Sequence, residues 1–185
     1  AMLGSFAARE YIHARSYSLL LTALSVPDDE FHAFTEVQEM TEKIDNMREM
    51  DTSTVRGLAL CLIKETFNEG VGLFASFVML LSFSLQSKLK GICQSVEFSV
   101  RDENMHCQGL IQLYRALVGE HKYLDAAHTL KDDAHAMALE TIDLEDKFLD
   151  IAFGVNNVTT IKKEDVKTYI RYITDLRLKQ LNFPP

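Results

Sequence analysis

Proline and glycine are scarce in this chain, with three prolines and eight glycines among 185 residues. Both residue types interrupt helices, and no run of alternating β-branched residues indicates strands. The composition therefore favours long helices. Because the length and the hydrophobic fraction of 47% are ordinary for one domain with a substantial core, we expect residues 1–185 to form a single domain.

A basic stripe is also lacking, and the net charge is -8. Nucleic acids are bound through clusters of Lys and Arg, so we expect no nucleic-acid partner. The three cysteines, Cys61, Cys93 and Cys107, have no paired spacing, which indicates reduced thiols and a cytoplasmic location. The first residues, AMLGSF, carry no positive segment, so we expect no signal peptide.

One apolar stretch has the length of a membrane span. Residues 70–87 contain no charged side chain. Ser76, Ser82, Ser84 and Gln86 dilute its apolar character. We therefore prefer a helix buried on all sides within a bundle and expect no association with a membrane.

Apolar periodicity and local breaks predict a series of helices. Their expected ranges are about Leu3–Leu24, a helix from Asp28, Thr54–Lys88, Leu89–Leu117, Tyr123–Phe153, and a last helix that carries Val166, Tyr169, Ile173 and Leu176. The second should expose a charged face that includes Lys43. Residues 51–53 are expected to cap the third helix, Gly70 and Gly72 to distort it, and Gly119 to end the fourth.

Two Glu-x-x-His motifs lie on stripes that should be buried. Glu10 and His13 share a stripe with Leu3, Phe6, Tyr17, Leu20 and Leu24. Glu103 and His106 share one with Leu89, Ile92, Val96, Ser99, Leu110, Leu113 and Leu117. An unpaired carboxylate or imidazole on a buried face is strongly unfavourable, and a metal ion is the simplest explanation.

Three other pairs have the same spacing but a different setting. They begin a helix or lie beside an apolar stripe, where charged residues are usually solvated. These pairs are Asp29 with His32, Asp125 with His128, and Asp132 with His135.

The spacing of the two buried motifs suits a shared metal site. Residues i and i+3 of a helix point the same way, so each motif offers one oxygen and one nitrogen. Mixed carboxylate and imidazole ligands favour iron or manganese over zinc. Glu69 is the expected third acid, with Glu65 as its competitor. Tyr17, one turn after His13, is either a core tyrosine or a one-electron donor to the metals.

Three sequence blocks, at residues 10–17, 69–77 and 101–106, resemble the small (β) subunit of class I ribonucleotide reductase in order and spacing. Residues 169–178 are similar to a late helix of that family, so the resemblance covers essentially the whole chain. It implies an all-α fold of the ferritin-like superfamily, a long-helix bundle with a dinuclear metal site between core helices. Iron, manganese or a mixed pair would occupy that site.

The resemblance also implies a role for each ligand. Glu10 and Glu103 would bridge the two metals. His13 would bind one ion, whereas Glu69 and His106 would bind the other.

A second group of residues would act in radical chemistry. The resemblance implies that Tyr17 is oxidised to a stable radical and that Asp102 couples a metal-bound histidine to radical transfer. Leu73 and Phe77 would form a hydrophobic shell beside the radical. In some members of the family the oxidising equivalent stays on the metals instead.

The oxidising equivalent would serve a separate large subunit, which reduces ribonucleotides, and the small subunit would form a homodimer. The family has one more metal-binding aspartate before the first motif, but only nine residues precede Glu10, so we expect that helix and the family's C-terminal tail to be missing here. Two alternatives remain open: another ferritin-like dimetal oxidase or iron-storage protein, and a non-catalytic helical scaffold.

Overall fold

A computed structural model describes the chain except for residues 28, 31–35, 47–49, 125–128 and 156–159. Every regular element in the described part is a helix, as the composition predicts. The elements are α1 (Met2–Ala23), α3 (Gln38–Asn46), α4 (Val55–Gly70), α5 (Phe74–Leu81), the 3-10 helix η2 (Ser82–Gln86), α6 (Lys90–Glu120), the 3-10 helix η3 (Lys122–Leu124), α8 (Lys131–Val155) and α9 (Lys163–Gln180).

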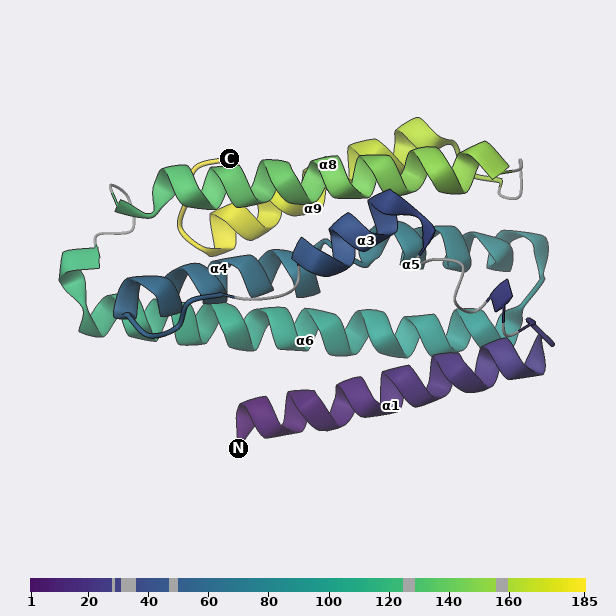
Figure 1. The fold of residues 1–185 in the computed structure, drawn as a ribbon, viewed down its shortest axis with the longest axis horizontal. Helices are drawn as coiled ribbons and strands as arrows, with labels where there is room; N and C mark the ends of the chain where they lie inside the picture. Colours follow the sequence, from purple (N-terminus) through teal and green to yellow (C-terminus); the bar gives the residue numbers. More distant parts are fainter. Residues whose placement is uncertain (28, 31–35, 47–49, 125–128, 156–159) are drawn as a thin grey trace.

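The helices form an elongated bundle in which α6 is the longest element (Figure 1). On one side α6 packs against α4 and α5, and these in turn contact the α8 and α9 pair. Helix α1 lies on the opposite, outer side of α6, and α3 packs on α8. The bundle of the ferritin-like type that we expected is confirmed, with α6 between α1 and the remaining core helices.

The expected third helix is divided in two. Helix α4 ends at Gly70, and α5 begins only at Phe74. A Cβ atom on Gly70 would lie 2.6 Å from Nε of Arg177, and that nitrogen donates a hydrogen bond to the Gly70 carbonyl at 3.2 Å. The distortion predicted at Gly70 is therefore confirmed, but a continuous helix to Lys88 is wrong, because a buried arginine binds the carbonyl at the break.

Several predicted helix ends also differ from the structure. Thr54, rather than residues 51–53, caps α4, since its hydroxyl accepts a hydrogen bond from the Gly57 amide at 3.0 Å. Leu89 has a left-handed φ of 48° and precedes α6 instead of lying within it. Gly119 does not end α6, which continues to Glu120. A glycine that caps a helix at its C-terminal end usually has a positive φ, and Gly119 does not have one.

Within the range of the helix expected from Tyr123, a 3-10 helix comes first, residues 125–128 lie outside the described residues, and α8 runs from Lys131. The start of the second predicted helix lies partly outside the described residues, and its described part is α3. His32, Asp125 and His128 also lie outside the described residues.

The apolar stretch Val55–Gln86 is long and apolar enough to cross a membrane by length and composition alone. In the structure it is broken at residues 71–73, and 44% of its most apolar window is buried within the bundle. Several of its apolar side chains, including Ile63, Phe67 and Phe74, belong to the hydrophobic core, but Leu85 is 71% exposed, so the stretch is not buried on all sides as expected. This placement supports the interpretation of a core segment.

Lys43 does not lie on a solvated face, and that prediction is wrong. Its side chain is buried between α3 and α8, where the ammonium pairs with the fully buried carboxylate of Glu145. The ammonium also lies 4.8 Å from the centre of the Phe148 ring. Glu145 follows the buried ladder of Ala138 and Thr141 at steps of three and four, which is the sequence signal that this pair offered.

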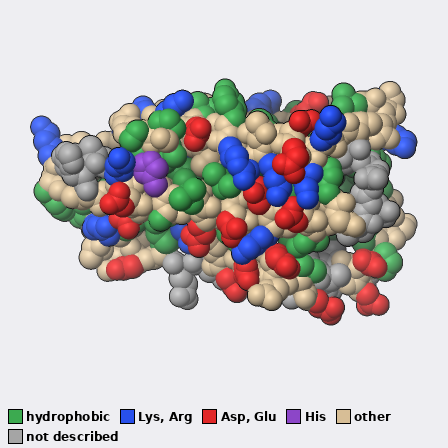
Figure 2. Space-filling model, turned by 90° about the horizontal axis from the view of Figure 1, so that it is seen from above, with side chains coloured by type: hydrophobic (Ala, Val, Ile, Leu, Met, Phe, Trp, Pro, Cys, Tyr) green, Lys and Arg blue, Asp and Glu red, His purple; other side chains and the backbone are tan. Residues whose placement is uncertain are grey.

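The surface over α8 and α9 carries both signs of charge side by side (Figure 2). Arg171 forms an ion pair with Asp146 at 2.6 Å, and Lys163 and Lys167 both lie 3.0 Å from Asp150. Exposed pairs of this kind contribute little stability each. Their mixture leaves this face without a basic stripe.

Candidate metal centre

Helix α6 supplies the buried half of the candidate site. Ser99, Glu103 and His106 lie at steps of four and three along it, Asp102 directly precedes Glu103, and each of the four is at most 4% exposed. The middle of the stripe predicted from sequence, from Val96 to Leu110, is buried, whereas Leu89 and Leu113 are exposed. The helix therefore directs two carboxylates and an imidazole toward its neighbours instead of solvent.

Helix α1 is much less buried than its stripe predicted. His13 is its only buried residue, and the carboxylate of Glu10 is 48% exposed. Leu3 and Leu24, at the two ends of the stripe, are each more than half exposed. The expectation of a fully buried stripe is wrong here, because α1 has α6 as its principal neighbour and is open on its other faces.

Glu103 lies between the two histidines. One of its oxygens, Oε1, is 3.0 Å from Nδ1 of His13, and the other, Oε2, is 3.1 Å from Nδ1 of His106. The centres of the two imidazole rings are 6.4 Å apart. A carboxylate with one oxygen toward each imidazole has the geometry needed to join two ions.

Glu10 and Glu69 complete the cluster. Oε1 of Glu10 is 3.4 Å from Nδ1 of His13 and 3.3 Å from Nδ1 of His106. Oε2 of Glu69 is 3.2 Å from the same nitrogen of His106. Ligand atoms of Glu10, Glu69, Glu103 and His106 all lie within 4.8 Å of one another. Glu65, the competing acid, instead faces Asn68, whose amide lies 3.4 Å from its carboxylate.

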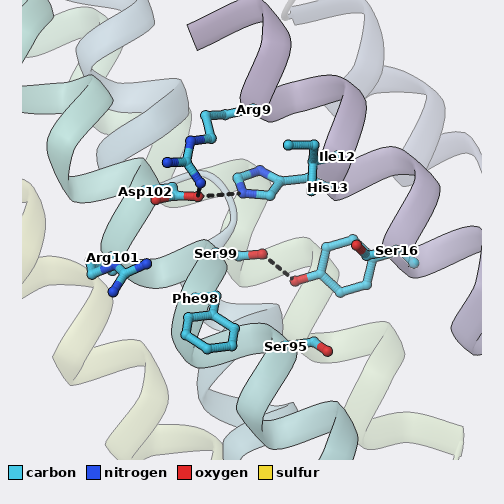
Figure 3. Close-up of a pocket in the computed structure, with 10 residues that line it drawn as sticks. Arg9, Ile12, His13, Ser16, Ser95, Phe98, Ser99, Arg101 and Asp102 are labelled. Atoms are coloured by element: carbon cyan, nitrogen blue, oxygen red, sulfur yellow. Dashed lines mark hydrogen bonds and ion pairs between the residues drawn. The ribbon is translucent and has the colours of Figure 1, made fainter. Parts of the chain in front are cut away.

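The second nitrogen of His13 points away from this cluster. Nε2 lies 3.2 Å from Oδ2 of Asp102, and Nη1 of Arg9 lies 3.6 Å from the same oxygen (Figure 3). Asp102 is 4% exposed, and no described residue hydrogen-bonds its other oxygen. A hydrogen bond from Nε2 to Asp102 would leave Nδ1 of His13 free to bind a metal ion.

The electrostatics of the cluster favour bound cations. Burial of Glu103 raises its pKa to about 10, and nearby carboxylates add to the effect: Glu69, Glu10 and Asp102. Without a cation, this carboxyl group therefore keeps its proton at neutral pH. Two divalent ions would compensate the same negative charges, and the donors are the carboxylate and imidazole groups that iron and manganese bind. The residues present therefore fit a dinuclear metal group.

The remaining described pair with this spacing is far from that geometry. Asp132 is exposed at the start of α8, and the two ring nitrogens of His135 lie 2.8 Å from the backbone carbonyl oxygens of Lys131 and Pro184. Within the described ranges, the ligand cluster includes neither residue. The position of each pair relative to the buried stripe therefore distinguishes the candidate ligand pairs from the solvated pair.

Tyr17 lies one turn beyond His13, on the side of α1 that faces α6. Its hydroxyl donates a hydrogen bond to Oγ of Ser99 at 2.9 Å. Partial burial raises the pKa of the Tyr17 phenol, an effect that the bond to Ser99 opposes and the charge of Glu103 reinforces. The ring packs against the hydrophobic core. Buried Phe77 belongs to this core, and half-buried Leu73 also packs against it.

Sequence reasoning missed three neighbours of the site. Ser99 was placed on the buried stripe without a role, although it accepts the hydrogen bond of Tyr17. The ring of Phe6 lies 4.3 Å from that of His106, and Arg9 pairs with Asp102. The position of Phe6 on the same stripe as Glu10 was a usable signal, whereas nothing local marked Arg9.

Comparisons with known proteins show the family to which the chain belongs. The family model described as "Ribonucleotide reductase, small chain" matches residues 1–185. The probable ribonucleoside-diphosphate reductase small subunit of Invertebrate iridescent virus 3 is 33% identical over 202 residues, covering 100% of this chain and 54% of the viral protein. Its counterpart in Invertebrate iridescent virus 6 is 30% identical, covering 98% of this chain and 60% of that protein.

A solved structure gives the same result for the fold. The crystal structure of a putative class I ribonucleotide reductase from Bacillus halodurans matches with a TM-score of 0.91 at 21% sequence identity. The match covers 100% of this chain and 68% of the solved chain. This chain thus spans somewhat more than half the length of the viral relatives that it matches.

Proposed function

Because this chain belongs to the ribonucleotide reductase small chain family, we propose that it holds a dinuclear iron or manganese centre and stores an oxidising equivalent on Tyr17. The observation that carries the proposal is the convergence of Glu10, Glu69, Glu103 and His106 within 4.8 Å. A separate large subunit would use the equivalent to reduce ribonucleotides to deoxyribonucleotides. The large subunit as a partner and a homodimer of this chain are both parts of the proposal.

The ligands have distinct roles in this proposal. Glu103 and Glu10 each face both histidines and would bridge the ions. His13 would bind one ion, and Glu69 with His106 would bind the other. When bound, a metal pair of this kind supplies one-electron oxidising power after reaction with an oxygen species.

The other residues position and protect. Asp102 orients His13 through Nε2, so that Nδ1 points to the centre, and it would also start the radical-transfer route toward the large subunit. Phe77 belongs to the hydrophobic core against which Tyr17 and Leu73 pack, and Phe77 and Leu73 would shield the Tyr17 radical. Tyr17 itself is close enough to Glu103 for that charge to affect its pKa.

A metal count on the purified protein tests the ligand set. We expect two iron or manganese ions per chain after loading, and the loss of at least one in Glu103→Gln, which replaces one of the two carboxylate oxygens that face the histidines with an NH₂ group. The matched control is Asp132→Asn, which alters the exposed acidic residue of a pair with the same spacing and should leave the metal content unchanged. Equal metal content in all three proteins would contradict the ligand assignment.

Electron paramagnetic resonance tests the radical. After loading and exposure to oxygen or peroxide, we expect a tyrosyl signal that disappears in Tyr17→Phe. It should persist in Tyr11→Phe, which alters a 73% exposed tyrosine on the same helix. Bound metal without a radical would favour another dimetal oxidase or a storage protein, and absence of bound metal would favour a helical scaffold.

A further inference from the structure

A cavity lies between α1 and α6 next to Tyr17 (Figure 3). Its volume is about 290 Å³, enough for several water molecules. Three serines line it, namely Ser16, Ser95 and Ser99, together with the Tyr17 ring and buried Asp102. Ile12 and Phe98 also line it, so one side of Tyr17 faces a space of mixed polar and apolar character.

In the hydrogen bond between Tyr17 and Ser99, Ser99 is the acceptor, so its own hydroxyl hydrogen remains free to donate. A serine hydroxyl has one donor hydrogen and two acceptor lone pairs. Ser99 accepts from the phenol at 2.9 Å, and none of the described residues accepts its own hydrogen. Because Ser99 lines the cavity and is only 3% exposed, its own hydrogen can point to water there while the phenol points to Ser99.

We propose that Ser99 is the positioning residue of Tyr17: it holds the phenol hydrogen and relays the proton to the water of this cavity when Tyr17 is oxidised. The inference rests on the proposed function, because it concerns the same tyrosine. It adds a residue and a proton route that the ligand cluster itself does not require.

The relay balances in atoms and charge. Oxidation removes one electron and one proton from the Tyr17 phenol and leaves a neutral phenoxyl. The phenol O–H bond breaks as an O–H bond forms on Ser99, and the original Ser99 hydrogen passes to a cavity water and then to solvent. The electron passes to a one-electron oxidant, the oxidised dimetal centre of the proposed function.

The same exchange predicts the state of the radical. After the transfer, the new hydrogen of Ser99 points back at the phenoxyl oxygen, which accepts a hydrogen bond from it. The Tyr17 radical would therefore be hydrogen-bonded to an exchangeable hydrogen. A radical enclosed only by apolar side chains would lack that bond.

The hydrogen bond is tested first without metal. Isotope-labelled tyrosine gives one ring-carbon resonance for each of the six tyrosines, and Tyr17→Phe identifies that of Tyr17. We expect Ser99→Ala to move this resonance, and Ser99→Thr to restore it. Ser95→Ala is the matched control, because Ser95 lines the same cavity but donates to the Gly91 carbonyl at 3.1 Å. An unmoved Tyr17 resonance in Ser99→Ala would overturn the proposal.

The relay is tested in the metal-loaded protein. High-field electron paramagnetic resonance with electron–nuclear double resonance in D₂O should detect an exchangeable deuteron coupled to the Tyr17 radical. We expect that coupling in the wild type, Ser99→Thr and Ser95→Ala, and its loss in Ser99→Ala. A coupling that survives in Ser99→Ala, or is absent from the wild type, would overturn the relay while leaving the proposed function intact. Absence of any tyrosyl radical in the wild type would overturn both.

Discussion

Tyr114 on α6 is among the largest fully buried side chains, and its hydroxyl has no hydrogen-bond partner within the described ranges. A buried hydroxyl of this kind has lost its water without replacement, which costs roughly 1–3 kcal/mol. Its ring packs 6.2 Å from that of Phe183 near the end of the chain. The ring thus stabilises the fold through packing, whereas the unpaired hydroxyl destabilises it.

We predict that Tyr114→Phe is at least as stable as the wild type at neutral pH. Under alkaline conditions its free energy of unfolding should exceed that of the wild type. Burial raises the pKa of Tyr114 to about 12 from an ordinary value of 10.0. The folded state therefore keeps a proton on Tyr114 that the unfolded state releases, and the wild type loses more stability than Tyr114→Phe as pH rises above 10, by about 2 kcal/mol near pH 12.

Urea denaturation at pH 8 and at several values above pH 10 measures this difference. Tyr172→Phe, which alters a 65% exposed tyrosine, is the control and should follow the wild type. Parallel pH profiles for Tyr114→Phe and the wild type would show that the phenol does not resist ionisation.

Helix α4 owes its end to Arg177 of α9. The buried guanidinium donates to the Gly70 carbonyl at 3.2 Å, to Oδ1 of Asn104 at 2.8 Å and to Oε1 of Gln180 at 3.0 Å. Gly70 follows Glu69, and Asn104 follows Glu103 in the chain. One side chain thereby links the two helices that carry these candidate ligands.

We predict that Arg177→Met lowers the free energy of unfolding by about 3 kcal/mol, because it leaves the Gly70 carbonyl and the Asn104 amide oxygen buried without a donor. Arg171→Met is the control on the same helix. Arg171 is exposed and pairs with Asp146, so its loss should cost under about 1 kcal/mol. Chemical denaturation compares the two variants, and similar values for both would argue against a linking role for Arg177.

In the molecule as a whole, α1 is the helix least covered by the others. It contacts mainly α6, yet it carries Glu10 and His13 of the candidate centre. The other ligands, Glu69, Glu103 and His106, lie on α4 and α6 within the bundle. Metal binding would therefore join an exposed helix to a packed core.

We predict that metal loading slows backbone hydrogen exchange in residues 2–23 and leaves α8 and α9 unaffected. At a metal concentration one hundred times the dissociation constant, linkage stabilises the bound state by about 2.7 kcal/mol, which corresponds to roughly 100-fold slower exchange through opening of α1. Mass spectrometry of exchanged peptides, with and without a chelator, measures the effect. Glu103→Gln should abolish it, and uniform protection of all helices would contradict local tethering by the metals.

The sequence by itself determined the helical class and the composition of the candidate ligand set. Steps of three and four residues are local, so they show that Glu103 and His106 share one face of a helix without knowledge of any partner. The same local signals placed a distortion at Gly70. Helix ends near Thr54, Leu89 and Gly119 were less accurate, because capping depends on single hydrogen bonds and backbone angles.

Only the tertiary structure decided which of these faces are covered and what they meet. Tyr17 and Ser99 are 82 residues apart, and Lys43 and Glu145 lie on different helices, so no local pattern relates them. The exposure of α1 likewise depends on which helices pack beside it. Periodicity reports the angle of a side chain around its own helix, whereas burial and polar pairing depend on neighbours that the folded chain brings from elsewhere.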